Sequence, residues 1–251
     1  RSFETDESGV VDLRSGVSLV NHRTPFAERW GGWYVSGTHG DQTHRGNLIG
    51  HEAFDQQKEK PNYLGNVTNL SRFFDVSIVP GKHSDIAALM VLEHQIHMHN
   101  FITRLNYAGR VTLMQYGHVR YLQSAVDAFL KYLLFVEEAE LTAPVQGSSS
   151  FAKDFASVGP KDVKGRSFRD LDMRKRMFKY PCSYLIYSEA FDALPGALKE
   201  TIYRRLFDIL TDKDSSADFV SLSDDSKRAI LEILRETKPD LPEYWKAEND
   251  G

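Results

Sequence analysis

The sequence predicts a mainly α-helical protein, with a helical bundle-like core and an irregular, glycine- and aromatic-rich N-terminal third that contains short strands. Two observations support this fold class. Helical patterns of apolar residues recur from residue 84 towards the C-terminus, and no sustained helical period occurs before it. The chain has 251 residues, of which 41% are hydrophobic and 26% are charged. These values are close to globular averages and predict a sizeable core.

The N-terminal third, residues 1–83, combines turns with short extended pieces. Residues 17–20 and 33–35 have strand-like composition, with glycines between and around them. Within the run 29–34, the aromatic residues Trp30, Trp33 and Tyr34 surround two glycines. This arrangement suits either a close approach of the backbone to a flat ligand or a packed turn.

From residue 84 onwards the pattern predicts helices. Ser84 and Asp85 form an N-cap, and a helix follows from residue 86 to 108 and closes at Gly109. Further helices are predicted over residues 115–138, 181–191, 195–211 and 223–238. Residues 142–166 have the composition of a long surface loop. We therefore expect a single domain over residues 1–251, with a possible subdomain boundary in that loop.

Charge, apolar runs and cysteine content limit the function. The formal net charge of −4 argues against nucleic acid as the main partner. No apolar run approaches the roughly 20 residues needed for a membrane span. Cys182, the single cysteine, excludes an internal disulfide, a four-cysteine zinc site and a CxxCH haem-attachment motif in this sequence. We expect Cys182 to be a buried structural thiol, and we expect a further segment upstream of Arg1.

The predicted helix 86–108 carries a histidine-rich stretch. At about 100° per residue, His94 and His97 share one face, with Glu93 at its border and Arg104 about two turns further along. Apolar residues cover nearly every other direction, so we expect the helix to be buried. Buried polar groups need partners, because each unpaired one costs about 1–3 kcal/mol. Metal or haem ligation would supply such partners, and so would a satisfied hydrogen-bond network.

A second histidine cluster lies in the glycine-rich loop 37–47, where His39 and His44 follow the aromatic run. Two loop imidazoles and one or two helix imidazoles would satisfy zinc, copper or iron by ligand type. Neither cluster has the HExxH pattern of zinc hydrolases. We expect His22, His83 and His118 to be solvent-facing or capping residues.

Several long blocks resemble a family of exported bacterial cytochrome-c-like proteins. They are residues 26–40 (FAERWGGWYVSGTHG), 44–47 (HRGN), 89–95 (LMVLEHQ) and 178–188 (FKYPCSYLIYS). Members of that family usually carry a CxxCH motif just upstream of the point where this sequence begins. The resemblance therefore implies a periplasmic or otherwise exported haem c protein, with its haem attached through an upstream segment.

The leading hypothesis is a haem- or metal-binding redox protein, either an electron carrier or peroxidase-like. His39, His44, His94 or His97 would supply a ligand, Trp30, Trp33 and Tyr34 would pack on the cofactor, and Arg104 would pair with Glu93 or a haem propionate. A redox partner or a larger envelope complex would be its partner. One alternative is an enzyme dependent on zinc or another transition metal, with Glu93 as base. The other is a non-catalytic helical subunit of an envelope assembly.

Overall fold

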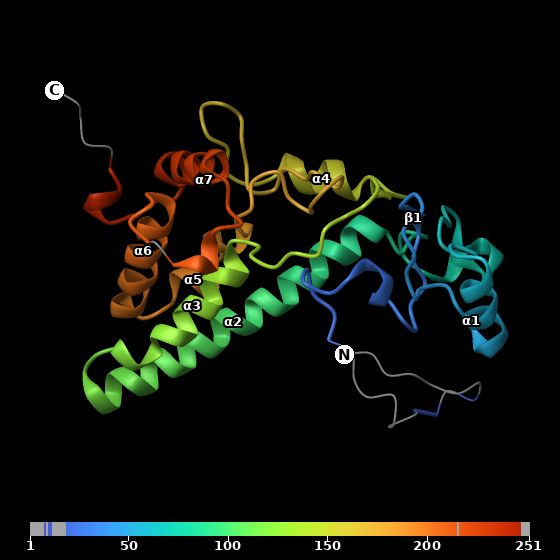
Figure 1. Cartoon of the computed structure of the whole chain (residues 1–251), viewed down its shortest axis with the longest axis horizontal. Helices are drawn as coiled ribbons and strands as arrows, with labels where there is room; N and C mark the ends of the chain where they lie inside the picture. The colour runs from blue at the N-terminus through green and yellow to red at the C-terminus, as the bar shows by residue number, and fades with distance from the viewer. Residues whose placement is uncertain (1–7, 9, 12–18, 215, 247–251) are drawn as a thin grey trace. The chain divides into compact units, whose positions relative to one another are not determined.

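The structure is a computed structural model that describes residues 8, 10–11, 19–214 and 216–246. These residues form seven α-helices and one two-stranded sheet, which confirms the predicted mainly α-helical class (Figure 1). Of the strand-like segment 17–20, residues 17 and 18 lie outside the described residues, and residues 19 and 20 belong to no strand.

The chain forms two compact units, each assembled from several segments. Unit 1 takes in the described residues up to His94, together with Glu138–Ser157 and Leu171–Met177. Unit 2 takes in Gln95–Glu137, Val158–Asp170 and the described residues from Phe178 onwards. The chain passes from unit 1 to unit 2 between residues 157 and 158. These residues lie within the segment 142–166, where the sequence predicts the possible subdomain boundary.

Unit 1 is built around a minimal sheet, in which β1 (Gly37–Thr38) pairs antiparallel with β2 (Gln146–Gly147). A Cβ atom at residue 37 would collide with the Ile86 side chain and the Gln146 carbonyl oxygen, so only glycine fits there. The unit also contains α1 (Gly50–Glu59), α4 (Phe151–Ser157) and the first part of α2 (Ile86–Tyr116). No residue of α1 is buried, which explains why no apolar period predicted this helix.

The N-terminus of α2 is fixed by the carboxylate of Asp85, as the predicted cap requires. Its Oδ1 accepts hydrogen bonds from the N–H groups of Ala87 (2.9 Å) and Ala88 (3.0 Å). Its Oδ2 accepts two more, from the N–H (2.8 Å) and the hydroxyl (2.7 Å) of Ser149. A parallel β-bridge between the backbones of Ser36 and Asp85 connects the start of α2 to the segment before β1. Asp85 therefore links three segments of unit 1, two through its carboxylate and one through its backbone.

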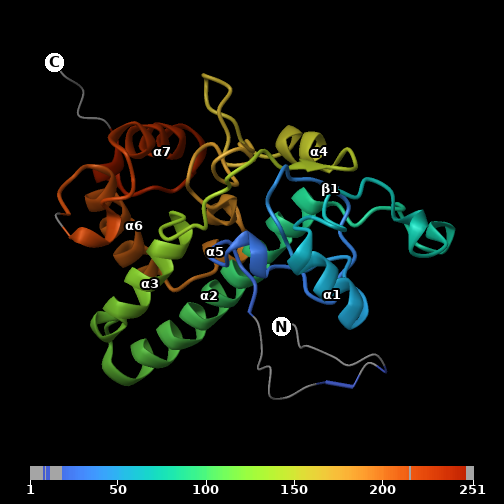
Figure 2. The ribbon, with the colours of Figure 1, turned by 45° about the vertical axis from the view of Figure 1, so that its right-hand side comes forward.

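Unit 2 is a helical bundle in which α6 (Gly196–Leu210) packs against both α3 (Gln123–Leu133) and α7 (Asp224–Thr237) (Figure 2). The helices face one another with apolar residues at spacings of three and four. These are buried residues: Val126, Phe129, Leu130 and Leu133 of α3; Leu198, Ile202, Leu206 and Ile209 of α6; Ile230, Ile233 and Leu234 of α7. The same spacings predicted α6 and α7 to within two residues.

Other predicted boundaries were wrong. The helix that starts at residue 86 does not close at Gly109 but continues to Tyr116. Gly109 is instead a packing position, because a Cβ there would lie 2.9 Å from Leu198 Cδ2 of α6. The predicted helix 115–138 is interrupted by a turn at Gly117 (φ 70°), so α3 covers only residues 123–133. The predicted helix 181–191 is a 3-10 turn, Tyr184–Tyr187, followed by the short α5 (Glu189–Asp192).

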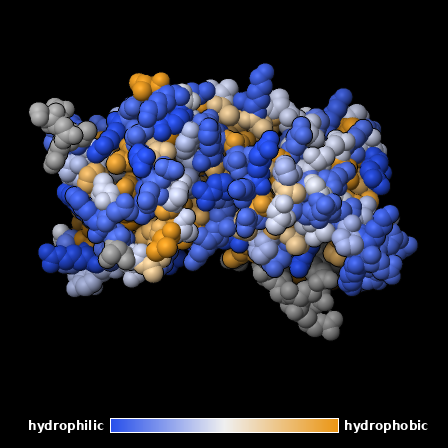
Figure 3. Space-filling view, turned by 45° about the horizontal axis from the view of Figure 1, so that its top comes forward, coloured by the Kyte–Doolittle hydropathy of each residue, from blue (hydrophilic) through white to orange (hydrophobic). Residues whose placement is uncertain are grey.

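The remaining regular structure consists of 3-10 turns at Phe26–Glu28, Leu70–Arg72, Val76–Ile78, Arg120–Leu122, Ala217–Phe219 and Glu243–Trp245. No helix among the described residues is long and apolar enough to cross a membrane. The face drawn in Figure 3 is mainly hydrophilic, with separate hydrophobic patches.

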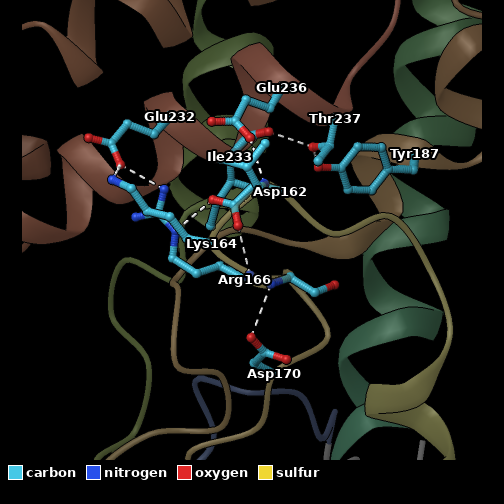
Figure 4. Close-up of polar contacts among 11 residues, drawn as sticks. Asp162, Lys164, Arg166, Asp170, Tyr187, Glu232, Ile233, Glu236 and Thr237 are labelled. Carbon is cyan, nitrogen blue, oxygen red and sulfur yellow. Dashed lines mark hydrogen bonds and ion pairs between the residues drawn. The ribbon is translucent and has the colours of Figure 1, made fainter.

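An ion-pair network in unit 2 fastens the loop before residue 170 to α7 (Figure 4). Arg166 donates from Nε to Asp162 (2.6 Å) and from Nη2 to Glu232 (2.6 Å), and Lys164 also reaches Glu232 (2.8 Å). Burial opposes ionisation of Asp162, but hydrogen bonds from Arg166 outweigh it and lower the pKa of that carboxyl. Hydrogen bonds from Lys164 and Arg166 lower the pKa of Glu232.

We predict that Arg166→Ala lowers the free energy of unfolding by about 1–3 kcal/mol at pH 7, because Asp162 and Glu232 each lose a charge-assisted hydrogen bond from its side chain. The folded pKa values lie below the unfolded ones, so this stabilisation exists above the unfolded pKa, roughly 4, and disappears as pH falls through the folded values. Denaturant unfolding at pH 7 and pH 3 measures both effects. Arg228→Ala, whose pair with Asp225 is highly exposed, is the control and should change stability by less than about 0.5 kcal/mol. An equal loss for Arg166→Ala at both pH values would contradict the prediction.

Candidate functional site

Two buried imidazoles, His39 and His44, lie side by side in the loop that follows β1. Their ring centroids are 4.7 Å apart. Phe26 packs against both rings, at 5.4 Å and 6.1 Å, and Trp30 packs edge-on against His44 at 5.2 Å. The loop thus brings together three residues that the sequence singled out, His39, His44 and Trp30, and adds Phe26, which it did not.

The glycine–aromatic run forms a packed turn at Trp30. This residue has a left-handed backbone (φ 64°), which is uncommon for a residue other than glycine. The turn is closed by a hydrogen bond from Trp33 N–H to the Trp30 carbonyl (3.0 Å) and by another from Arg45 N–H to the Arg29 carbonyl (3.0 Å). The indole of Trp30 is buried, and that burial offsets the backbone strain.

The protonation state of His44 follows from its hydrogen bonding. Its Nδ1 accepts a hydrogen bond from the N–H of Gly46 (2.9 Å), so the ring proton must sit on Nε2. Burial lowers the pKa of His44 to about 3, with a contribution from the nearby His39. His44 is therefore a neutral donor, and its buried Nε2–H has no hydrogen-bond partner among the described residues.

His39 differs, because neither of its ring nitrogens makes a hydrogen bond to the described residues. Burial lowers its pKa, and the nearby main chain of Gly65 and Gln42 opposes part of that decrease. A Cβ at residue 65 would lie 2.8 Å from Cε1 and 2.9 Å from Nε2 of this ring, so a larger residue there would press against His39. A neutral imidazole has one nitrogen lone pair, and on His39 no hydrogen bond occupies it.

A second pair of imidazoles consists of His22 and His94, both fully buried. Their Nδ1 atoms are 2.9 Å apart and share a hydrogen bond. The prediction that His22 faces solvent or caps a helix was wrong, because this long-range contact buries it. One Nδ1 must donate and the other accept. In neutral rings, the donor ring therefore has its lone pair on Nε2, and the acceptor ring has its proton there.

Arg29 lies beside the second pair and is fully buried. Its Nε donates to the Thr24 carbonyl (2.9 Å) and its Nη2 to the His22 carbonyl (3.2 Å), while Nη1 lies 3.7 Å from Glu93 Oε2. Burial raises the pKa of Glu93 to about 7, against the opposing effects of Arg29 and Trp30. Glu93 therefore pairs with Arg29 rather than with Arg104, and the alternative partner expected for Arg104, a haem propionate, stays a prediction.

A second carboxyl in unit 1, Glu138, behaves like Glu93. Burial raises its pKa to about 7, although the N–H of Met177 donates to it (2.7 Å) and Arg176 and Arg29 also favour its ionised form. Sequence reasoning missed Glu138 and Arg29 and misjudged His22, because each makes its contacts with residues far away in the sequence. For Arg29, the sequence offered one signal of a site residue, its position next to Trp30 in the aromatic run.

The other predicted site residues have different surroundings. Unit 2 contains His97, which packs against Phe101 (5.1 Å) and Tyr132 (4.7 Å), and Arg104, which is exposed. Within unit 1, Trp33 is 56% exposed. Tyr34 packs against two phenylalanines, Phe73 (5.2 Å) and Phe74 (5.0 Å).

The expectation that α2 is buried on every side was also wrong. Leu92 is 45% exposed and Ile96 is 54% exposed, so part of the helix faces water. An apolar composition all round therefore did not imply complete burial.

The ligand geometry available to a metal ion is limited. Within the described part of the chain, no group of three or more His, Cys, Asp or Glu side chains is arranged to hold a metal ion. Cys182 is buried, as predicted, and burial raises the pKa of its thiol.

A pocket of about 230 Å³ is lined by residues that include Asn47 and Leu64, the neighbours of Gly46 and Gly65. It is smaller than the roughly 300–1,000 Å³ usual for ligand pockets.

Comparisons with known proteins identify no relative. No family model, no curated protein and no solved structure matches the chain.

We predict that Glu93→Gln flattens the pH dependence of stability. Between the unfolded pKa of 4.5 and the folded value of about 7, the folded protein keeps a proton that the unfolded chain has released. Stability from this group is therefore present at low pH and is lost as pH rises through that window. Denaturant unfolding from pH 5 to pH 8 should show a smaller loss in the variant than in the wild type, by on the order of 1–3 kcal/mol.

The control for this experiment is Glu59→Gln, which changes an exposed carboxyl of α1 in the same unit. Its stability should follow the wild-type curve. A wild-type slope in Glu93→Gln would show that Glu93 does not titrate near neutral pH.

Proposed function

We propose that unit 1 binds a haem or transition-metal cofactor in a redox-type protein, and that His39 supplies the ligand. The observation that carries this proposal is the buried, neutral imidazole of His39, whose ring nitrogens make no hydrogen bond to the described residues. A buried polar atom without a partner is unfavourable by about 1–3 kcal/mol, and coordination to a metal would satisfy the nitrogen lone pair.

Haem fits the donor set better than a free ion. A protein-bound zinc ion usually takes three or four protein ligands, and the described residues offer no such group. Haem iron takes one or two axial ligands from the chain, and a bound haem supplies electron-transfer or peroxidase-like chemistry. His39 would hold the iron. His44 would act as a hydrogen-bond donor rather than a ligand, because Gly46 already occupies its Nδ1 and its Nε2 carries a proton.

The imidazole pair of His39 and His44 is kept from water. Phe26 and Trp30 pack around the imidazole pair and exclude solvent. The cytochrome-c-like resemblance supports the further proposal that the protein is exported to the periplasm and acts with a redox partner or envelope complex. In that case an upstream segment would attach the haem covalently.

A second candidate function is that of a metal-dependent enzyme with Glu93 as general base. It is favoured by one observation, the rise of the Glu93 pKa to about 7, because a base titrating near the operating pH is the most effective. Stoichiometric zinc in a protein without a Soret band would support this function over haem binding. A colourless, metal-free protein would instead support a non-catalytic subunit, whose histidines serve as hydrogen-bond partners.

We predict that His39→Ala alters the cofactor and that His83→Ala does not. The full-length protein, including any upstream segment, is purified from its native host, and its absorption spectrum, metal content and midpoint potential are measured. If His39 is an axial ligand, its removal shifts the Soret band and the potential even when the haem stays covalently attached. His83 is an exposed histidine of the same unit and serves as the matched control. An unchanged spectrum in His39→Ala would remove His39 as a ligand.

A glycine variant tests the same position without deleting the imidazole. Gly65→Ala places a methyl group against Cε1 and Nε2 of His39, so it should displace the ring and shift the Soret band in the same direction. Gly31→Ala is the matched control in unit 1, because its Cβ would be 3.8 Å from the nearest atom, Arg45 Cβ. Equal spectra for the two variants would contradict the placement of the ligand.

A further inference from the structure

The second half of α2 and the start of α3 carry an uneven distribution of charge. Residues 94–126 contain no Asp or Glu, whereas Arg104, Arg110 and Arg120 lie within them. The chain as a whole has a formal net charge of −4. A basic segment in an acidic protein indicates a surface that attracts an anionic partner.

The same region exposes large hydrophobic side chains. Tyr107 is 76% exposed, Met114 is 81% exposed and Tyr121 is 70% exposed, and Val111 and Tyr116 are also exposed. Residues 107, 111 and 114 are spaced to share one face of α2, and Arg104 precedes them on that face. We call residues 104–121, the end of α2 and the turn into α3, the hairpin tip. Exposed apolar side chains that cluster in this way mark an interaction site.

The hairpin tip is convex and internally ordered. Figures 1 and 2 both show the turn between α2 and α3 projecting beyond α6 within unit 2. At the turn, Tyr116 packs edge-on against Tyr121 at 4.9 Å, and His118 lies beside both rings, at 6.3 Å and 5.3 Å. The three rings therefore contact one another at the turn.

We propose that the hairpin tip docks on an anionic lipid bilayer surface. Tyrosine is enriched at membrane–water interfaces, where its ring meets the acyl chains and its hydroxyl meets the headgroups. Arginine buries its stem and directs its charge towards lipid phosphates. A convex tip with amphipathic aromatics and arginines, and without acidic residues, matches that environment. A protein partner would need a complementary concave surface, and the tip has too few cations for tight nucleic-acid binding.

This inference concerns unit 2 alone and does not depend on the cofactor proposed for unit 1. It describes attachment to one face of a bilayer, since no helix among the described residues can span one.

The test is co-sedimentation of the full-length protein with phosphatidylcholine vesicles, with and without phosphatidylglycerol. We expect binding to the anionic vesicles, decreasing as salt is added. Removing charge in Arg104→Gln and Arg120→Gln should weaken binding about fivefold per arginine. The triple variant Tyr107→Ser, Met114→Ser, Tyr121→Ser should weaken it at least as much. The matched control is Val163→Ser with Val220→Ser, which removes two exposed hydrophobic side chains of unit 2 outside the hairpin tip.

A site-specific label separates insertion from general attraction. Met114→Cys can carry a polarity-sensitive fluorophore, because Cys182, the native thiol, is buried. Its emission should shift to the blue on anionic vesicles, while the same label on Val163→Cys should not shift. The proposal is overturned if neither vesicle binds, if the triple variant binds like the wild type, or if both labels respond equally. Saturable binding to an acidic protein or a nucleic acid, with no vesicle binding, would also overturn it.

Discussion

The structure of unit 1 depends on one buried carboxylate. Asp85 accepts two hydrogen bonds from the first turn of α2 and two from Ser149, and its backbone bridges to Ser36. Hydrogen bonds to an ionised acceptor are about twice as strong as neutral ones. They fix where the helix starts relative to β1 and β2. Because a helix rises 1.5 Å per residue, Glu93 and His94 are then held about two turns further along, in the unit that contains the loop histidines.

Unit 1 encloses an unusual amount of polar chemistry for its size. A fully buried cation, Arg29, lies beside carboxyls whose ionisation is opposed by burial, and the same unit contains two buried imidazole pairs. Replacing such groups with apolar residues is often neutral or stabilising in other proteins, so stability alone is a weak reason for them. We propose a bound cofactor as the reason for these groups, in line with the proposed function.

The sequence predicted the elements whose cause is local. The spacing of apolar residues located α6 and α7, and the capping residue Asp85 located the start of α2. It did not predict α1, which has no buried face, or the burial of His22, which depends on a partner 72 residues away. His94 and His97 share a helical face, yet the chain assigns them to different units. Angular position on a helix says where a side chain points, and only tertiary structure says what it meets there.

Three buried groups of unit 1, Glu93, Glu138 and His44, have pKa values in an inverted order. In water a carboxylic acid ionises near pH 4 and an imidazolium near 6.5. Here the pKa of His44 is about 3, and the pKa values of Glu93 and Glu138 are about 7. In mildly acidic solution the carboxyls of Glu93 and Glu138 are protonated, whereas the imidazole of His44 stays neutral. Among these three groups, a proton taken up near neutrality therefore resides on a carboxyl oxygen, and His44 acts as a fixed dipole rather than as a proton carrier.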